Sequence, residues 1–255
     1  MARVFITGST DGLGLAAAQS LVAQGHEVVI HARSKSRAAE ARLARDGGVN
    51  VVTGDLSSLA ETLSLADQVN SIGPMDAVIH NAGIYTTPER GSTAEGHATI
   101  LAVNTLAPYI LTCLIDRPQR LVYLSSGLHR GGEGSLADID WKRRSWDAAK
   151  AYAESKLHVA AIAAALARKW PATICSAVDP GWVRTRMGGQ AAPVDLDTGQ
   201  RTQSWLAVTE EAEAKVSGGY WHNRTRQTPA HEVTDVEFQE KLLGMLHDLT
   251  GIALP

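Results

Sequence analysis

A tyrosine and a lysine four residues apart are the side chains of this sequence best suited to acid–base chemistry. They are the first and last residues of Tyr152-Ala-Glu-Ser-Lys156, in a stretch expected to be helical from about 147 to 169. This spacing puts both side chains on one face of a helix, one turn apart. A free phenol has a pKa of about 10, and a neighbouring ammonium group favours the phenolate and lowers that pKa. The pair is therefore a candidate for moving a proton to or from a bound molecule.

The elements that must position this pair are short apolar strands that alternate with helical stretches. Strands are expected at 3–7, 27–32, 49–53, 75–80, 120–125 and 172–178, with a last short strand at GGYW. Helices are expected at 13–24, 58–71, 94–115, 147–169 and 231–250, and a charged helix extends to about Asp46. Apolar strands separated by helices indicate a parallel sheet that is covered on both faces. We therefore expect an α/β fold, a single-domain doubly wound parallel sheet flanked by helices, with its ligand at the carboxyl ends of the strands.

A glycine-rich turn lies between the first expected strand and the first expected helix. It reads Thr7-Gly8-Ser9-Thr10-Asp11-Gly12-Leu13-Gly14. Glycines let the backbone approach a pyrophosphate closely, and a helix N-terminus supplies free N–H groups and a partial positive charge. The alternative is an ordinary tight turn from strand to helix. The position of the turn favours a Rossmann-like dinucleotide site made by Gly8, Ser9, Thr10, Gly12, Leu13 and Gly14.

The residue after the second strand bears on the choice of dinucleotide. Nineteen residues beyond Gly14, where NAD-selective folds carry an acidic residue, the sequence has Arg33. A guanidinium can bind a 2′-phosphate through forked, charge-assisted hydrogen bonds. A solvated surface arginine is the alternative, and Asp11 opposes NADP because it places a negative charge near the phosphates. The sequence favours NADP, with NAD as the other candidate.

Further motifs follow the expected strands in a fixed order. They are Asp55 in GDL, Asn81-Ala82-Gly83, Asn104 in AVNTLAP, Ser125-Ser126, and Pro180-Gly181-Trp182-Val183-Arg184-Thr185. Together with the glycine turn and YAESK, they resemble the short-chain dehydrogenase/reductase family over nearly the whole chain. The stretches HNAG, TAEGH, AVNTLAP, SSGLH and DPGWVRT are most similar to its retinol-dehydrogenase-like and carbonyl-reductase-like members.

The resemblance implies a role for each matching residue. Tyr152 would be the general acid/base, Ser126 would polarise the substrate oxygen, and Lys156 would lower the Tyr152 pKa and bind the nicotinamide ribose. Asn104 would hold a water that relays protons from Lys156 to solvent. The other implied cofactor contacts are Asp55 and Leu56 at the adenine, Asn81, Ala82 and Gly83 on the adenosine side, and Pro180, Gly181, Val183 and Thr185 toward the carboxamide.

Three of these assignments have simpler alternatives. Asn104 would then only satisfy a kink in its helix. Asp55 would be the N-cap of the helix that follows it. Ser125, rather than Ser126, would polarise the substrate oxygen.

Two segments depart in length from compact members of the family. The 25 residues between Ser126 and Tyr152 are more than usual and bring Trp141 and Trp146 near the substrate mouth. The stretch 111–121 is shorter than usual, which leaves both a monomer and a homo-oligomer open. The stretch 186–217 begins with the flexible MGGQAAP and is expected to be a substrate lid or insertion.

These features predict an NAD(P)-dependent oxidoreductase that transfers a hydride between nicotinamide and a carbonyl/alcohol substrate. The substrate is expected to be a bulky apolar ketone or aldehyde, against walls made by Trp141, Trp146, Trp182 and Trp205. The alternative from another class is a non-catalytic dinucleotide-binding sensor or scaffold. An epimerase or dehydratase with bound NAD is a third candidate.

Composition limits the other partners. A net charge of −3 and a pI near 6.3 disfavour nucleic acid as a partner. No signal peptide and no run of about 18 apolar residues is evident, so we expect a cytoplasmic protein without a membrane span. The two cysteines, Cys113 and Cys175, lie in apolar stretches typical of buried free thiols. No spacing of His, Cys or carboxylates suggests a metal site.

Overall fold

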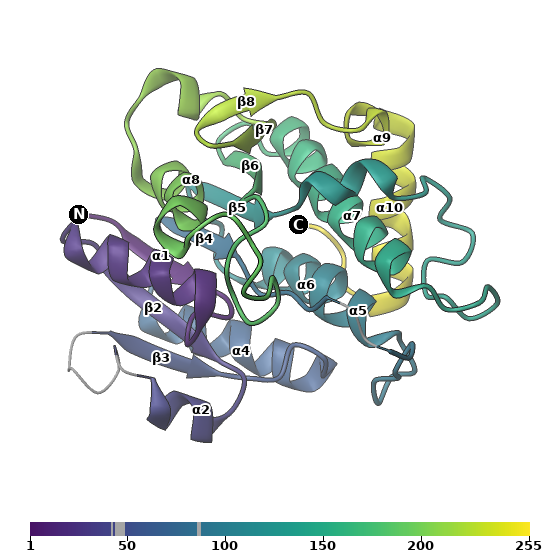
Figure 1. Ribbon diagram of the computed structural model, residues 1–255, viewed down its shortest axis with the longest axis horizontal. Helices are drawn as coiled ribbons and strands as arrows, with labels where there is room; N and C mark the ends of the chain where they lie inside the picture. Colours follow the sequence, from purple (N-terminus) through teal and green to yellow (C-terminus); the bar gives the residue numbers. More distant parts are fainter. Residues whose placement is uncertain (42, 44–48, 86–87) are drawn as a thin grey trace.

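A central sheet orders the molecule and sets where the sequence motifs meet. The computed structural model of the chain describes residues 1–41, 43, 49–85 and 88–255. Within these residues the sheet has eight strands in the order β3-β2-β1-β4-β5-β6-β7-β8 (Figure 1). The strands are β1 (Arg3–Ile6), β2 (Glu27–Ala32), β3 (Asn50–Thr53), β4 (Ala77–His80), β5 (Arg120–Leu124), β6 (Ile174–Asp179), β7 (Gly219–His222) and β8 (Thr225–Gln227). All neighbours pair in parallel except β7 and β8, which are antiparallel.

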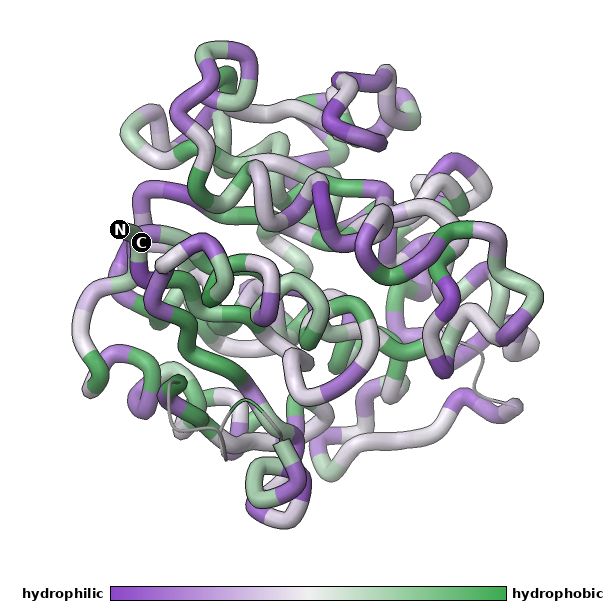
Figure 2. The backbone as a smooth tube through the Cα atoms, turned by 60° about the vertical axis from the view of Figure 1, so that its left-hand side comes forward, coloured by the Kyte–Doolittle hydropathy of each residue, from purple (hydrophilic) through white to green (hydrophobic). Residues whose placement is uncertain are grey.

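Helices cover both faces of this sheet, as the apolar strands predicted. On one face lie α1 (Gly12–Ala23) and α8 (Leu196–Val208), which pack side by side (Figure 1). On the other face lie α4 (Leu59–Ile72), α6 (Ala107–Leu114), α7 (Ala148–Lys169) and α10 (Val236–Thr250). Figure 2 shows hydrophobic residues gathered along the central strands and the inner sides of the helices, with hydrophilic residues on the outer turns. The prediction of a Rossmann-like, doubly wound sheet is confirmed.

Several element boundaries differ from those expected. The helix predicted over 94–115 starts only at α5 (Thr99–Leu101), continues as the π-helical turn η1 (Ala102–Leu106), and ends with α6. The stretch 231–250 is split into α9 (His231–Thr234) and α10, because Asp235 ends one helix and accepts the Glu237 amide as N-cap of the next. The charged helix after β2 is α2 (Lys35–Glu40), and its expected continuation through 42 and 44–46 lies outside the described residues. The antiparallel β8 was not predicted.

The packing of α4 on the sheet gives a stability prediction. Leu65 is fully buried in the core between this helix and the sheet, whereas Leu63 on the same helix is 37% exposed. Leu65→Ala is expected to lower the free energy of unfolding by about 3 kcal/mol, because it removes buried methyl groups and leaves a cavity. Leu63→Ala is the matched control and should change it by less than about 0.5 kcal/mol. Urea denaturation measures both, and equal losses would contradict this description of the core.

Candidate active site

The glycine turn joins β1 to α1 and lies against the loop that follows β4. Gly8 and Gly12 have positive φ values of 64° and 55°, which favour glycine. A Cβ on Gly14 would lie 2.4 Å from the Gly8 carbonyl oxygen and 2.5 Å from Asn81 Nδ2, so no larger side chain fits there. Asn81 Nδ2 donates to the carbonyl oxygens of Thr7 and Gly8, at 2.9 and 3.2 Å. The turn is therefore a tightly fixed, side-chain-free surface at the start of a helix, which fits a pyrophosphate.

Two buried histidines that the sequence reasoning did not assign support this edge of the sheet. His31 Nδ1 accepts the Gly8 amide at 2.9 Å, so its Nε2 carries the hydrogen donated to the Gly54 carbonyl oxygen at 2.8 Å. His129 Nδ1 lies 2.7 Å from the Ser126 carbonyl oxygen and acts as donor, because its Nε2 accepts an amide hydrogen. Burial lowers the pKa of both imidazoles, which keeps them neutral. A polar residue inside the apolar run EVVIHA was the available signal for His31.

Charged groups from other parts of the chain surround Asp11 in the glycine turn. Asp11 is the N-cap of α1 and accepts the Gly12 amide. Its carboxylate also faces two guanidinium groups, Arg37 at 3.5 Å and Arg186 at 3.4 Å. Arg33 is exposed directly after β2, where the sequence placed it. The negative charge of Asp11 thus faces two positive charges from outside the turn, Arg37 on α2 and Arg186 on the loop after β6.

The residues predicted near the adenine follow β3. Asp55 accepts the amide and the hydroxyl of Ser57, at 2.9 and 2.7 Å. Ser58, not Asp55, is the N-cap of α4, so the capping alternative for Asp55 is wrong. Leu56 is 6% exposed, and its side chain packs in the core.

Tyr152 and Ser126 meet at the carboxyl ends of the strands. Tyr152 lies on α7, and Ser126 follows β5 and caps the short helix η2 (Gly127–Gly131). Their side chains are hydrogen-bonded to each other. Ser125 points elsewhere, because its hydroxyl donates to the Lys156 carbonyl oxygen at 2.8 Å. Ser126 is therefore the hydroxyl beside the phenol, and the Ser125 alternative is wrong.

The pKa of Tyr152 differs from the sequence-based expectation. Burial raises it to about 12, and the hydrogen bond from Ser126 acts in the opposite direction without outweighing burial. The ring packs edge-on against Tyr85, with centroids 4.6 Å apart, in a small apolar cluster. The expectation that this pKa falls toward neutrality was wrong, because the desolvation of the phenolate could not be seen from the sequence. Tyr152 remains a protonated phenol at neutral pH.

Lys156 lies on the same face of α7, as its spacing predicted. Its ammonium nitrogen is 5.5 Å from the Tyr152 ring centroid and donates to the Leu124 carbonyl oxygen at 2.8 Å. Burial lowers its pKa to about 8. A Cβ on Gly83 would lie 3.2 Å from this nitrogen and 3.4 Å from Asn104 Oδ1. Gly83, Lys156 and Asn104 therefore meet at one point beside Tyr152.

Asn104 occupies the π-helical turn η1, and such turns often occur at functional sites. Its Oδ1 accepts the Ile84 amide at 2.8 Å, and its Nδ2 donates to the Ile84 carbonyl oxygen at 2.9 Å and to Ser155 Oγ at 3.0 Å. The Asn104 side chain thus joins the loop after β4 to α7, the helix that carries Tyr152 and Lys156. The simpler alternative, in which Asn104 only satisfies a kink in its own helix, does not account for these contacts.

The loop after β6 folds back over the glycine turn. Val183 and Val194 form an isolated parallel β-bridge within this loop. Thr185 lies against Gly12, because a Cβ placed on Gly12 would be 3.6 Å from the Thr185 methyl group. Pro180 and Gly181 begin this loop at the strand end. The expected lid over 186–217 divides into this loop, which ends at Asp195, then α8, and then the short helix η3 (Ala212–Lys215). Helix α8 packs on α1 and the sheet, and a Cβ on its Gly199 would lie 3.1 Å from the Leu13 side chain of the turn.

The tryptophans proposed as pocket walls occupy different places. Trp205 lies on α8 and is buried against Trp221 of β7, in a different apolar cluster from Tyr152. Trp182 is 58% exposed on the loop after β6. Trp141 and Trp146 pack edge to face in the same cluster as Tyr152, with ring centroids 5.4 Å apart. Trp141 and Trp146 therefore lie beside Tyr152, and Trp182 lies on the loop that follows the neighbouring strand end.

Two other kinds of feature are absent from the residues that the structure describes: a cluster of metal ligands and a membrane-spanning helix. Across residues 1–41, 43, 49–85 and 88–255, no three His, Cys, Asp or Glu side chains gather in a way that could hold a metal ion. In the same part of the chain no helix has both the length and the apolarity needed to cross a membrane.

Known proteins are similar to this chain in sequence and in fold. The sequence pattern of the short chain dehydrogenase family matches residues 2–194. An uncharacterized oxidoreductase of Emericella nidulans is 44% identical over 100% of this chain and 99% of its own length. Human retinol dehydrogenase 13 is 27% identical over 99% of this chain and 85% of its own length. The solved NADPH-bound carbonyl reductase from chicken fatty liver has a TM-score of 0.68 and 21% identity, covering 89% of this chain and 98% of that one.

The chain belongs to the short-chain dehydrogenase/reductase family, in its retinol-dehydrogenase-like subgroup. It is an NAD(P)-dependent oxidoreductase.

Proposed function

We propose that this oxidoreductase reduces the carbonyl group of a bulky apolar ketone or aldehyde, with NADP as its cofactor. The observation that carries the proposal is the hydrogen-bonded pair of Tyr152 and Ser126, with Lys156 one helical turn away. Two hydroxyl groups directed at one point can both contact a carbonyl oxygen. The phenol is protonated at neutral pH, and the nearby Lys156 ammonium would offset the cost that burial adds to the loss of its proton.

The glycine turn would form the phosphate-binding part of the cofactor site. The glycine backbone at Gly8, Gly12 and Gly14 and the N-terminus of α1 beyond its Asp11 cap would hold the pyrophosphate. Lys156 would bind the nicotinamide ribose, and Asp55 the adenine side. Arg33, assisted by Arg37, would bind the 2′-phosphate, and the NADPH complex of the chicken carbonyl reductase supports this choice.

The chain's own residues would act in the following way. The bound nicotinamide supplies the hydride for the carbonyl carbon. Ser126 donates a hydrogen bond that polarises the substrate oxygen, and Tyr152 gives that oxygen a proton as negative charge develops on it. The Lys156 ammonium, with a pKa of about 8, lies close enough to stabilise the phenolate that remains. Asn104 would then hold the water through which a new proton reaches Lys156.

The substrate class is proposed from the surroundings of Tyr152. Its neighbours are apolar or aromatic: Ile84, Tyr85, Ile100, Trp141, Trp146 and Ala151. Leu128, Trp182 and Met187 follow the carboxyl ends of β5 and β6 and are 52%, 58% and 47% exposed. Exposed apolar side chains beside a catalytic group favour an apolar ligand. The loop at 186–195 is the part of the expected lid that we propose to close over it.

The test is turnover of NADPH, followed at 340 nm, with a panel of aliphatic and aromatic aldehydes and ketones. We expect consumption of NADPH with the larger apolar members of the panel. Tight NADPH binding without consumption of any carbonyl compound would favour the sensor or scaffold alternative instead.

Arg33 provides a separate prediction about the cofactor. Arg33→Ala is expected to raise the KM for NADPH about tenfold and to leave the KM for NADH unchanged, because it removes a charge-assisted contact to the 2′-phosphate. Lys35→Ala, an exposed cation two residues away, is the matched control. Steady-state kinetics with both cofactors measures the effect, and an equal rise for NADH would exclude a 2′-phosphate contact.

A further inference from the structure

A turn with an unusual backbone supports the aromatic side of the site. Trp141 has a φ of 54°, a left-handed conformation that is costly for an aromatic residue. The Asp138 carboxylate holds the turn in this form, because it accepts the amides of Lys142, Arg143 and Arg144 at 2.9, 3.0 and 3.0 Å. The conformation is therefore imposed by several hydrogen bonds at once, which is typical of functional sites.

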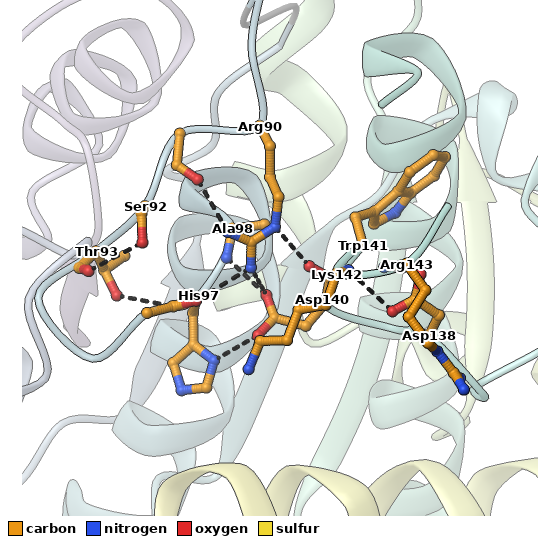
Figure 3. A network of polar contacts seen from close by, with 12 residues as sticks. Arg90, Ser92, Thr93, His97, Ala98, Asp138, Asp140, Trp141, Lys142 and Arg143 are labelled. Carbon is orange, nitrogen blue, oxygen red and sulfur yellow. Dashed lines mark hydrogen bonds and ion pairs between the residues drawn. The ribbon is translucent and has the colours of Figure 1, made fainter. Parts of the chain in front are cut away.

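The first of two buried carboxylates ties this turn to another loop. Asp140 is 5% exposed, and its Oδ1 accepts Arg90 Nη2 at 2.8 Å and the Ala98 amide at 2.6 Å. Its Oδ2 lies 3.0 Å from His97 Nδ1 and 3.1 Å from Lys142 Nζ. Figure 3 shows Arg90, His97 and Lys142 converging on this carboxylate, while Trp141 points away from it. Asp140 thus joins the turn to the loop formed by residues 88–98.

The second carboxylate ties the same turn to the catalytic helix. Glu154 is 2% exposed and lies between Tyr152 and Lys156 in sequence. Arg144 binds it with both terminal nitrogens, at 2.7 and 2.6 Å, and Trp141 Nε1 donates to it at 3.0 Å. The Arg144 guanidinium also lies 3.7 Å from the centroid of the Trp141 ring. Trp141 is therefore held on its edge by Glu154 and on its face by Arg144.

The contacts of Trp141 indicate what Asp140 and Glu154 do at the site. It is 5% exposed, so it supports the pocket rather than lining it, and the half-buried Trp146 and Tyr85 pack against the same cluster. A turn that served stability alone would not need a strained tryptophan beside the general acid. The ion pairs of Asp140 and Glu154 hold the turn on both sides of Trp141. Because charge-assisted hydrogen bonds have a narrow range of length and angle, they fix the position of the Trp141 ring.

We infer that Asp140 and Glu154 are positioning residues that set the size selectivity for the substrate, by fixing the 138–144 turn and its tryptophan beside Tyr152. This inference rests on the proposed function, since it concerns the substrate of the same site. Neither carboxylate contacts the reacting atoms. Their loss is expected to loosen the wall and weaken the binding of large apolar substrates, which depend on it, more than that of small ones.

The experiment compares two probes with NADPH: propanal as a small substrate and 2-naphthaldehyde as a large one. Asp140→Asn and Glu154→Gln are each expected to lower the ratio of kcat/KM for the large probe to that for the small one by about tenfold, mainly through KM. Glu133→Gln is the matched control, because Glu133 is an exposed carboxylate 3.6 Å from the same Arg144. It should leave the ratio within about twofold of the wild-type value.

Amide hydrogen exchange gives a second measurement that needs no substrate. Exchange should become faster in residues 88–98 for Asp140→Asn and in residues 138–144 for both variants, without a matching rise across α7. Arg90→Lys and Arg144→Lys, which retain charge but lose the forked geometry, replace any variant that does not fold. An unchanged selectivity ratio, or an equal loss with both probes, overturns the inference. If the wild-type protein consumes neither probe nor any other carbonyl compound, the proposed function itself fails, and the inference fails with it.

Discussion

Tyr152→Phe is expected to lower kcat for carbonyl reduction by about a thousandfold, within the range usual for loss of a general acid. The substitution removes only the hydroxyl group that gives its proton to the substrate oxygen. The phenylalanine ring would still fill the cluster with Ile100 and Trp141 and pack edge-on against Tyr85, so the fold and the cofactor site should be retained. Single-turnover kinetics at 340 nm measures the rate, and calorimetry measures NADPH affinity, which should change less than about twofold.

A matched control separates this effect from the loss of any buried tyrosine hydroxyl. Tyr109 is also buried, and its hydroxyl donates to the Ile252 carbonyl oxygen at 2.8 Å, away from the site. Tyr109→Phe should leave kcat unchanged. Activity of Tyr152→Phe close to the wild-type value would mean that another group supplies the proton.

Acidification from pH 7 to pH 5 is expected to lower the free energy of unfolding by about 4 kcal/mol. Burial lowers the pKa of His80 and of His158 to about 3 each. In the unfolded chain both imidazoles would titrate near pH 6.5. The unfolded state therefore binds more protons than the folded state between about pH 6.5 and pH 3, and stability falls as the pH falls through that window. Each histidine contributes about 2 kcal/mol of the loss by pH 5.

Variants at single histidines test this account. His158→Gln removes one of these groups and should reduce the change in unfolding free energy between pH 7 and pH 5 by about 2 kcal/mol. His247→Gln, on the exposed side of α10, should leave the full change in place. Urea denaturation at each pH provides the free energies. A stability that stays constant over this range, or an undiminished loss in His158→Gln, would show that these histidines do not control it.

The sheet and the placement of the site were predictable because their signals are local. Each strand is an apolar run, and each motif follows a strand end, so the doubly wound topology brings the motifs to one edge. The structure places Gly8, Gly14 and Asn81 in contact there, with Ser126, Tyr152, Lys156 and Asn104 around one point. The choice between Ser125 and Ser126 needed the structure, because neighbouring hydroxyl groups differ only in direction.

The features that escaped prediction depend on contacts between distant residues. The helix expected from 94 begins at Thr99 because the Ala98 amide is held by Asp140, which is 42 residues further along. The pKa of Tyr152 depends on how completely its ring is buried, which no local pattern reports. The left-handed Trp141 depends on a carboxylate that binds three amides at once. These three properties arise only after the sheet has assembled.

The π-helical turn at residues 102–106 carries a consequence for how the chain tolerates length changes. A π-turn contains one residue more than an α-turn, and it lies just before Pro108, whose missing N–H would interrupt a regular α-helix at this point. Loss of a single residue from the turn would therefore not produce a regular helix through 99–114. It would rotate Asn104 by about 100° relative to α6 and away from Ile84 and Ser155. A descendant of this chain that is one residue shorter here would lose the amide that links the loop after β4 to α7.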